Sequence, residues 1–366
     1  MPGAGKPLLY TLHCGNFYGT ERMALATLEG LTEYRRVVLA PRSTASPSVL
    51  DVARDLSYEV RPIEGLGQLL LALIPVFLRH RQVDVISSSA SHNLVCAWLA
   101  RVLFVRLRQL NVVHGGGEER HSYANKHRLN GTRVRLVAVS RFVQERLLAH
   151  DVRPDKIEVI ANFLSPSDAR TRPRRPPFAR VRAGSRPKDT ARIRVAVVSR
   201  LDPVKRLDLI LEAVATGQLA DFRFDVFGAG DLLSSYRERA AALGGTIEFH
   251  GYVADVGDRL AAADFLLHVC PDEPFGLVVL EAFNAGLPVI VPDAGGPAEL
   301  VEDGVSGLTY AAGDLADLLR CLKAAAALAD ARLDAMAAAA RAALDSRYSA
   351  AVGVEAYRRA LAHAGR

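Results

Sequence analysis

Two glutamates stand in one short stretch whose residue types suit the binding of a polar ligand. The stretch reads "PDEPFGLVVLEAFNAG", and seven residues separate Glu273 from Glu281. Glu281 falls within an apolar run, and a buried carboxylate must be paired or hydrogen-bonded because losing its water costs several kcal/mol. A carboxylate that accepts two adjacent hydroxyls, such as those of a ribose, would be satisfied. A helix cap for Glu273 and an ion pair for Glu281 are the structural alternatives.

The same stretch contains a predicted helix start and is preceded in the chain by two cations. Gly276 and Leu277 should begin a helix, whose free N–H groups and positive dipole end favour an anion. Upstream, "SRLDPVKRLDLIL" places Arg200 and Lys205 around a turn that follows an apolar run. Two cations at a strand end suit a diphosphate. Solvated loop charge is the alternative for each cation taken alone.

Two further segments carry glycines beside polar groups. Gly15 and Gly19 in "HCGNFYGTERMAL" precede a helical pattern, which suits contact with phosphate or sugar. His114 follows an apolar run and stands beside three glycines, so it is a candidate for a binding site, although a structural histidine is the commoner case. Gly228 in "FGAG" lacks the third glycine of a dinucleotide site, and this pattern alone is weak evidence for one.

These residues lie just after short apolar runs that alternate with helical patterns. Such alternation predicts parallel sheets with helices on both faces, and ligands bind such sheets at the carboxyl ends of the strands. We therefore predict an α/β protein with two doubly wound Rossmann-like domains that face a cleft. The predicted strands are Leu8–Leu12, Val37–Leu39, Val83–Ile86, Leu110–Val113, Leu136–Val139 and Ile157–Ile160 in the first half, and Val195–Val198, Phe222–Phe227, Ile247–Phe249, Phe265–Val269, Val289–Val291 and Leu308–Tyr310 in the second.

Composition and charge set the predicted boundaries and partners. A segment rich in proline and arginine, 165–192, separates an N-terminal domain, 1–164, from a C-terminal domain, 193–349, and a last helix, 350–366, is a candidate to cross back to the N-terminal domain. Residues 1–194 carry a net charge of +15 and residues 195–366 a net charge of −9. This asymmetry favours an anionic partner for the first half, with a solvated basic surface as the alternative. We expect no nucleic-acid partner.

Other features point to a protein of a reducing compartment. The four cysteines are far apart and have no metal-ligand spacing. We find no signal peptide, so a cytoplasmic location is expected, with a peripheral site on the inner face of the membrane as an extension. The longest apolar run, Leu69–Leu78, is too short to span a bilayer and contains Pro75. We interpret it as a buried helix, with a membrane-surface helix as the alternative.

The motifs together resemble those of glycosyltransferase family 4, the retaining, GT-B fold enzymes that use nucleotide-sugars. The resemblance rests on "PDEPFGLVVLEAFNAGLPVI", "GGPAELV" and "SRLDPVKRLDLIL", and extends to "FYGTERMALATLEGL" and "VAVSRFVQERLLAHDVRPDKIEVIANF" in the first half. It covers nearly the whole chain. It implies an acceptor-binding first domain and a second domain that binds the donor, most simply a UDP-sugar, which is a substrate and not a cofactor.

The resemblance also implies roles for single residues. Arg200 and Lys205 would hold the donor diphosphate, Glu281 the ribose hydroxyls and Glu273 the donor sugar. His114 would lie near the transferred sugar. The catalytic set is then Glu273, Arg200, Lys205 and His114. The donor-binding set is Gly19, Arg200, Lys205, Gly228, Tyr252, Val253, Glu273, Phe275, Gly276, Leu277 and Glu281, with no metal ligand.

The resemblance implies metal-independent transfer, because the two cations and the helix start would supply the positive charge that the diphosphate needs. The acceptor is not identified by the sequence; an anionic or lipid-linked molecule and an anionic membrane surface are the partners that the basic half suggests. Two other functions remain open, a sugar-nucleotide epimerase or hydrolase on the same fold and a non-catalytic nucleotide-sugar-binding protein. Turnover of donor without acceptor, or no turnover at all, would distinguish them.

Overall fold

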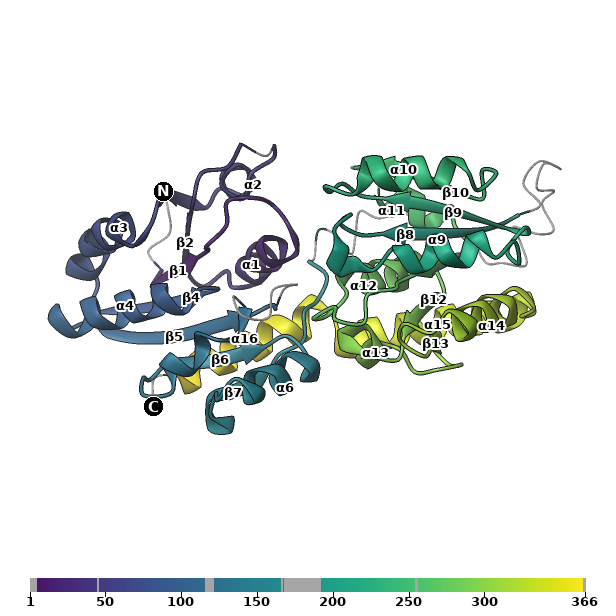
Figure 1. Ribbon diagram of the computed structural model, residues 1–366. Helices are drawn as coiled ribbons and strands as arrows, with labels where there is room; N and C mark the ends of the chain where they lie inside the picture. The colour runs from purple at the N-terminus through teal and green to yellow at the C-terminus, as the bar shows by residue number, and fades with distance from the viewer. Residues whose placement is uncertain are drawn as a thin grey trace. The chain divides into compact units, whose positions relative to one another are not determined.

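The computed structural model describes residues 5–44, 46–115, 122–165, 167, 192–253 and 256–364. The chain divides into two compact units, and each contains one parallel sheet with helices packed on it (Figure 1). The first domain consists of Met1–Pro166 and Ser349–Arg366, and the second domain of Ser167–Tyr348. Nearly all of the predicted proline- and arginine-rich linker, 165–192, lies outside the described residues.

The first domain is built on a seven-stranded sheet of order β3-β2-β1-β4-β5-β6-β7, and all its strand pairs are parallel. Six of its strands overlap the apolar runs predicted from the sequence, three of which extend one residue beyond the strand. Strand order reverses between β1 and β4, and a doubly wound sheet offers a binding site at such a point. The strands are β1 (Pro7–Thr11), β2 (Arg35–Ala40), β3 (Glu59–Pro62), β4 (Gln82–Ser87), β5 (Arg106–Val113), β6 (Arg135–Ala138) and β7 (Ile157–Val159).

Strand β3 was not predicted. It lies at the sheet edge, is half-buried along its length and contains two charged residues. Glu59 pairs with Arg35 on the neighbouring strand and with Arg61 on its own strand. A search for apolar runs misses such a strand because its backbone pairs on one side only and its side chains need not be apolar.

Helices α3 and α4 pack against each other and cover one face of the first sheet. Helix α3 buries Leu69, Leu73, Val76 and Phe77, but leaves Leu71 and Leu78 exposed. The helix predicted at 69–78 is present, but it is buried on one side only, because only that side of α3 faces the core. The helices of this domain are α1 (Gly19–Gly30), α2 (Val49–Asp55), α3 (Leu66–Arg79), α4 (Ala90–Val102) and α6 (Arg141–Ala149), with the short 3₁₀ helices η1 (Lys126–Leu129) and η2 (Pro154–Lys156).

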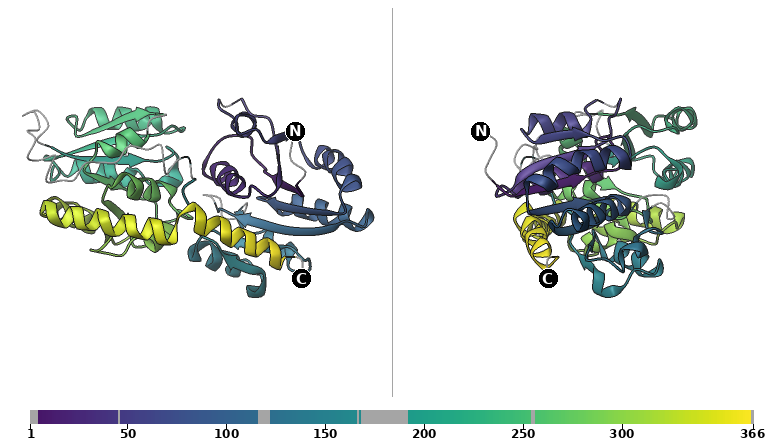
Figure 2. Two further views of the ribbon diagram at one scale, coloured as in Figure 1. Left: turned by 180° about the vertical axis from the view of Figure 1, so that it is seen from behind. Right: turned by 90° about the vertical axis from the view of Figure 1, so that its left-hand side faces the viewer.

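The last helix, α16 (Ala350–His363), belongs to the first domain although it follows the second in sequence. It packs on α1 and β5 (Figure 2). Gly353 lies so close to Phe163 that a Cβ there would come within 2.0 Å of the ring. Arg358 donates hydrogen bonds to Glu33 and Glu355. Burial and the Arg358–Glu33 ion pair anchor the helix to the rest of the first domain, whereas Glu355 lies on α16 itself.

The second domain contains a six-stranded parallel sheet of order β10-β9-β8-β11-β12-β13. All six strands correspond to predicted runs. The sequences of β11 and β12 are continuously apolar, as in strands that a parallel sheet buries on both faces, whereas β9 and the edge strand β10 alternate apolar with polar residues. The strands are β8 (Ile193–Val198), β9 (Phe222–Phe227), β10 (Ile247–Gly251), β11 (Phe265–Leu267), β12 (Val289–Pro292) and β13 (Leu308–Tyr310).

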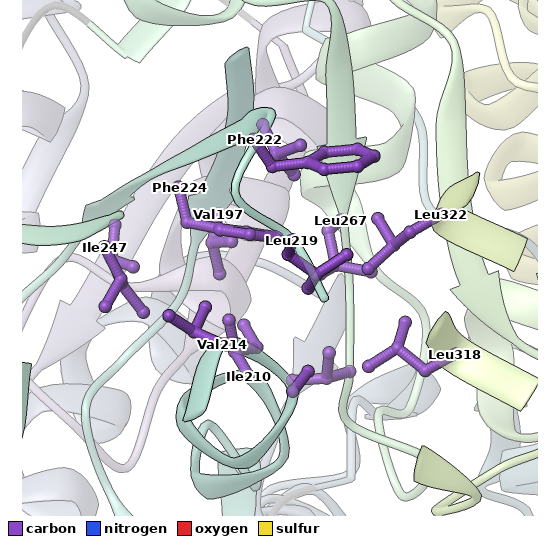
Figure 3. Packing of buried hydrophobic residues seen from close by; sticks show 14 of the residues in the cluster. Val197, Ile210, Val214, Leu219, Phe222, Phe224, Ile247, Leu267, Leu318 and Leu322 are labelled. Atoms are coloured by element: carbon purple, nitrogen blue, oxygen red, sulfur yellow. The ribbon is translucent and has the colours of Figure 1, made fainter. Parts of the chain in front are cut away.

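One core of the second domain lies where β8, β9 and β11 meet α9 and α14 (Figure 3). Ile210 and Val214 from α9 point towards Val197 and Phe224, and Leu318 and Leu322 of α14 complete the cluster. This packing holds the strand ends that carry the candidate site. The helices are α9 (Asp208–Ala215), α10 (Leu233–Ala241), α11 (Val256–Ala261), α12 (Leu277–Ala285), α13 (Gly295–Leu300), α14 (Leu315–Ala326) and α15 (Asp330–Arg347), with the 3₁₀ helix η4 (Pro203–Lys205).

Candidate functional site

The candidate site of the second domain is built around the loop that joins β11 to α12. Helix α12 begins at Leu277, and Gly276 precedes it with φ +91°, a conformation that glycine adopts without strain. The loop rests on the start of α13, where the Gly296 N–H donates to the Glu273 carbonyl oxygen at 2.8 Å. A Cβ on Gly296 would come within 2.3 Å of the Pro274 carbonyl oxygen, so this close approach requires glycine. Backbone packing therefore fixes the loop.

The structure brings Lys205 and Glu273 into direct contact. The Lys205 Nζ atom lies 2.6 Å from the Glu273 Oε2 atom, and both side chains are largely buried. Lys205 ends the turn that follows β8, whereas Glu273 follows β11, the neighbouring strand. Two residues 68 positions apart thus form one polar centre at the carboxyl end of the sheet.

Each member of this pair stabilises the charged form of the other. Burial would raise the pKa of Glu273, but the charge of Lys205, aided by His268 and Arg200, outweighs burial and lowers it. Burial would lower the pKa of Lys205, but Glu273, with Cys270, outweighs burial and raises it. Both groups are therefore ionised at neutral pH.

Arg200 lies close enough to this pair to influence both pKa values. Its side chain is 52% exposed, and its Nη2 atom is 3.1 Å from the Asp202 Oδ2 atom. Because the Arg200 guanidinium group is exposed, it can bind an anion that approaches the buried Lys205 ammonium group from solvent. The prediction that Arg200 and Lys205 come from one turn near the loop of Glu273 agrees with this geometry.

Glu281 lies on α12 and is buried, with 3% of its surface exposed. It stands in the second turn of the helix, on a side that does not face solvent. Its apolar neighbours in the sequence suggested this burial. Phe275, also buried, meets the Tyr348 ring edge-on at a centroid distance of 6.2 Å and packs the loop against the domain. Leu277 is the first residue of α12.

The other predicted donor-binding residues of this domain follow the neighbouring strands. Gly228 follows β9, and its N–H donates to the Gly251 carbonyl oxygen at 2.8 Å. Tyr252 and Val253 follow β10, and Tyr252 is 73% exposed. These residues share the carboxyl edge of the sheet with Arg200 and Glu273, since β10, β9, β8 and β11 are adjacent in that order.

Gly19 and His114 belong to the first domain. Gly19 is the first residue of α1, and the Tyr18 N–H before it donates to the Glu21 carboxylate at 3.1 Å. His114 follows β5, and burial, with Lys126 and His13 nearby, lowers its pKa to about 3. The glycines after Gly115 in "HGGG" lie outside the described residues.

His268 is a site residue that the sequence prediction missed. We predicted a strand to Val269, whereas β11 ends at Leu267, so His268 is the first residue beyond the strand. It is buried, its Nε2 atom has no hydrogen-bond partner in the part of the chain that the structure describes, and burial lowers its pKa to about 4. A histidine inside an otherwise apolar run was the available signal.

Among the described residues, one group outside this centre brings three possible metal ligands close together. The ligand atoms of Asp225, Glu248 and His250 lie within 4.8 Å of one another, on β9 and β10. Asp225, however, already forms ion pairs with Arg194 and Arg223. Two guanidinium groups on the central carboxylate oppose the binding of a cation there.

Comparison with known proteins matches the second domain to one family and the whole chain to one fold. Residues 192–327 match the family described as "Glycosyl transferases group 1". The GDP-mannose-dependent alpha-mannosyltransferase of Mycobacterium tuberculosis is 34% identical over 122 residues, 33% of this chain and 30% of that protein. The D-inositol 3-phosphate glycosyltransferase of Geodermatophilus obscurus is 35% identical over 143 residues, 35% of this chain and 32% of that protein.

The chain thus matches about a third of the length of these curated relatives. The crystal structure of HepE from Anabaena in complex with UDP matches 97% of this chain and 99% of that one, with a TM-score of 0.78 and 21% identity. These findings confirm the resemblance drawn from the sequence: residues 192–327 match the Glycosyl transferases group 1 family, and the chain has the fold of the GT-B glycosyltransferases.

Proposed function

We propose that the protein is a retaining glycosyltransferase that moves a sugar from a nucleotide-sugar to an acceptor hydroxyl. The observation that carries the proposal is the ion pair of Lys205 and Glu273, held at the start of α12 and beside Arg200. This arrangement offers cations for a diphosphate and a carboxylate for sugar hydroxyls at one place. The family match over residues 192–327 supports it.

The donor is proposed to be a UDP-sugar. HepE of Anabaena has been crystallised with UDP and with UDP-glucose, and its fold matches this chain. The mannosyltransferase of M. tuberculosis is named for GDP-mannose, which makes GDP-mannose the comparison donor in any test. In the proposed complex, Glu281 accepts the ribose hydroxyls, the residues from Phe275 to Leu277 meet the sugar and phosphates, and Tyr252 and Val253 frame the base.

The reaction breaks the bond between the anomeric carbon and the donor phosphate oxygen. The electron pair of that bond leaves with the diphosphate, where Arg200, Lys205 and the first turn of α12 stabilise it. The acceptor oxygen bonds to the anomeric carbon on the same face, and its proton passes to the departing phosphate oxygen. Glu273 orients the sugar through its hydroxyls.

The test is a donor screen by thermal shift with UDP-, GDP- and ADP-sugars, followed by product analysis with and without acceptor alcohols. The proposal expects one donor class to raise the melting temperature and to yield a glycoside with retained anomeric configuration. Free sugar formed at the same rate without acceptor would indicate a hydrolase, and an altered sugar on the nucleotide an epimerase. Activity should survive EDTA; loss of activity that magnesium or manganese restores would contradict metal independence.

The first domain also has a surface that supports peripheral association with an anionic membrane. Five large apolar side chains on α3, on α4 and just after α4 are more than half exposed: Leu71 (69%), Leu78 (66%), Trp98 (58%), Val102 (51%) and Phe104 (86%). We call them the α3–α4 patch. Four exposed arginines accompany them in sequence: Arg79, Arg81, Arg101 and Arg106. Within the described residues, no helix reaches the length and apolarity that a membrane span needs.

Apolar side chains and arginines on α3 and α4 and just beyond their ends suit an interface of acyl chains and anionic headgroups, where each basic residue contributes about 1 kcal/mol. We expect the protein to co-sediment with anionic vesicles more than with neutral ones, and less so at high salt. A variant with Trp98→Ser and Phe104→Ser should lose this binding, whereas Val305→Ser, an exposed change in the second domain, should not. Equal and negligible sedimentation with both vesicle types would contradict membrane association.

A further inference from the structure

A buried lysine and three histidines of the first domain form a cluster that the roles above leave mostly unused. The members are His13, which follows β1, His92 in the first turn of α4, His114, which follows β5, and Lys126, which begins η1. We call them the histidine–lysine cluster. They come together at the carboxyl ends of β1, β4 and β5, next to the point where the strand order reverses.

Ser88 joins two of the members. The His13 Nδ1 atom lies 2.9 Å from the Ser88 Oγ atom, and the Lys126 Nζ atom donates to the Ser88 carbonyl oxygen at 3.1 Å. The Ser88 residue is held in place by its neighbour, because the Ser87 Oγ atom accepts from Thr11 at 2.7 Å and from the Ser89 N–H at 3.0 Å. The loop from β4 to α4 therefore fixes the spacing between an imidazole and an ammonium group.

A chain of amides orients the second acceptor of Lys126. Gln109 and the Leu110 carbonyl oxygen accept from the Asn93 Nδ2 atom at 3.0 and 3.3 Å. Asn93 in turn accepts from the Asn111 Nδ2 atom at 2.7 Å, which leaves the Asn111 Oδ1 atom to accept from Lys126 at 2.9 Å. This network is buried, so the ammonium group has a preorganised place in the protein interior.

Lys126 nevertheless has no counter-charge in the part of the chain that the structure describes. Only 6% of its surface is exposed, both of its hydrogen-bond acceptors are neutral, and no described carboxylate forms a salt bridge with it. Burial lowers the pKa of Lys126 to about 8, so the group remains largely protonated at neutral pH. A buried charge without a partner is costly for a fold, and such groups concentrate at functional sites.

Two imidazole nitrogens of the cluster also lack partners. The His92 Nδ1 and the His114 Nε2 atoms are buried and make no hydrogen bond with any described residue, and 8% of His92 is exposed. Both side chains sense the charge of Lys126, which places them close to it. The start of α4, a helix of 13 residues, adds the positive end of its dipole at the same place.

We infer that the histidine–lysine cluster is a binding subsite for an anionic group, a phosphate or a carboxylate. Such a group would supply the counter-charge of Lys126 and the hydrogen-bond partners of the two orphaned imidazoles. The anionic group belongs either to the acceptor or to the donor diphosphate. This assignment to a substrate rests on the proposed function. Anion binding itself does not depend on turnover, so it can be tested when the donor and acceptor are unknown.

The experiment follows the ten histidines by NMR with labelled imidazole rings while inorganic phosphate is added, with sodium chloride at matched ionic strength as the reference. The expected result is a saturable shift at His13, His92 and His114 in phosphate only. Lys126→Met should abolish it. Lys156→Met is the matched control, because the Lys156 ammonium group also donates to a backbone carbonyl, that of Thr132, in the same domain.

A purely structural role for Lys126 predicts a different pattern. In that case Lys126→Met lowers the melting temperature, and phosphate leaves the spectrum unchanged in the wild type. Lys126→Arg, which keeps the charge, should retain at least part of the phosphate response if the subsite exists. No phosphate-specific shift in the folded wild-type protein, or an equal shift in folded Lys126→Met, overturns the inference.

The same titration in saturating UDP distinguishes an anionic group of the acceptor from the donor diphosphate. If phosphate still shifts the three histidines with UDP bound, the subsite serves the acceptor. If UDP alone shifts them and prevents the phosphate response, it serves the donor diphosphate. Either result supports an anion subsite, and neither depends on whether transfer occurs.

Discussion

The two domains each bury a lysine at the carboxyl end of their sheet, but they balance its charge differently. In the second domain Lys205 pairs with Glu273 at 2.6 Å, and this partner outweighs burial and raises the pKa of the lysine. In the first domain Lys126 has neutral acceptors only among the described residues, and burial lowers its pKa to about 8. The same residue type is thus a balanced half of an ion pair in one place and an unbalanced charge in the other.

This difference indicates what each site can do with an arriving anion. A diphosphate at Lys205 must share the ammonium group with Glu273, so binding rearranges an existing pair and frees a carboxylate for sugar hydroxyls. An anion at Lys126 displaces no described carboxylate and gains the full attraction of a buried charge. The first arrangement suits a group that changes charge during a reaction, and the second suits recognition of a permanent anion.

The largest effect is expected at the cations of the second domain. Arg200→Ala and Lys205→Ala should each reduce turnover by roughly 100-fold or more, because a lost contact to the leaving diphosphate costs about 3 kcal/mol in the transition state. Steady-state rates on folded variants are the measurement. If both variants lose less than about threefold in turnover, Arg200 and Lys205 do not bind the leaving diphosphate.

The pairing of Lys205 with Glu273 predicts a non-additive effect on stability. Lys205→Met alone should lower the free energy of unfolding by about 3 kcal/mol, since it leaves Glu273 buried without a partner, whereas the double variant with Glu273→Gln should recover much of the loss. Urea denaturation measures both. Additive losses would mean that the two side chains do not form a pair in solution.

The pH dependence of the same pair follows from the directions of its pKa shifts. The lowered pKa of Glu273 gives stability that is present above its ordinary value of 4.5 and is lost as pH falls through its folded value. The raised pKa of Lys205 gives stability that is present below 10.5 and is lost as pH rises through its folded value. The double variant should therefore be less sensitive than the wild type at both extremes.

The two glutamates should separate in kinetics. Glu281→Gln is expected to raise the Michaelis constant for the donor several-fold with little change in turnover number, because a ribose contact acts equally in the ground and transition states. Glu273→Gln should lower the turnover number. The roles are wrongly assigned if Glu273→Gln changes only the Michaelis constant.

The smallest effect concerns the unbalanced lysine. Folding lowers the pKa of Lys126, so the unfolded chain keeps this proton to higher pH than the folded chain. Below about pH 8 the charged Lys126 therefore reduces the free energy of unfolding, and this reduction disappears as the pH rises from about 8 to 10.5. The wild type should therefore gain stability relative to Lys126→Met over that range. Melting temperatures across it are the check, with Lys156→Met as the control, and a flat difference would contradict a lowered pKa of Lys126 in the folded protein.

Much of the second domain could be read from local sequence. Most of its strands are mainly apolar because a parallel sheet is buried on both faces, and the start of α12 follows from Gly276. Residues after these strands converge by topology alone, which is why Arg200, Lys205 and Glu273 could be grouped before the structure was known. Edge strand β3 was missed because half-buried pairing needs no apolar run.

What the sequence by itself determined is which residue types follow each strand, and hence the chemistry available to the protein. Only the tertiary structure decided which charges are balanced. Lys126 stands in an unremarkable polar segment, and nothing local distinguishes it from Lys156 or predicts its burial beneath Asn111 and Ser88. The physical reason is that the free energy of a charge depends on the dielectric and partners that distant segments bring to it, and a chain position carries no record of either.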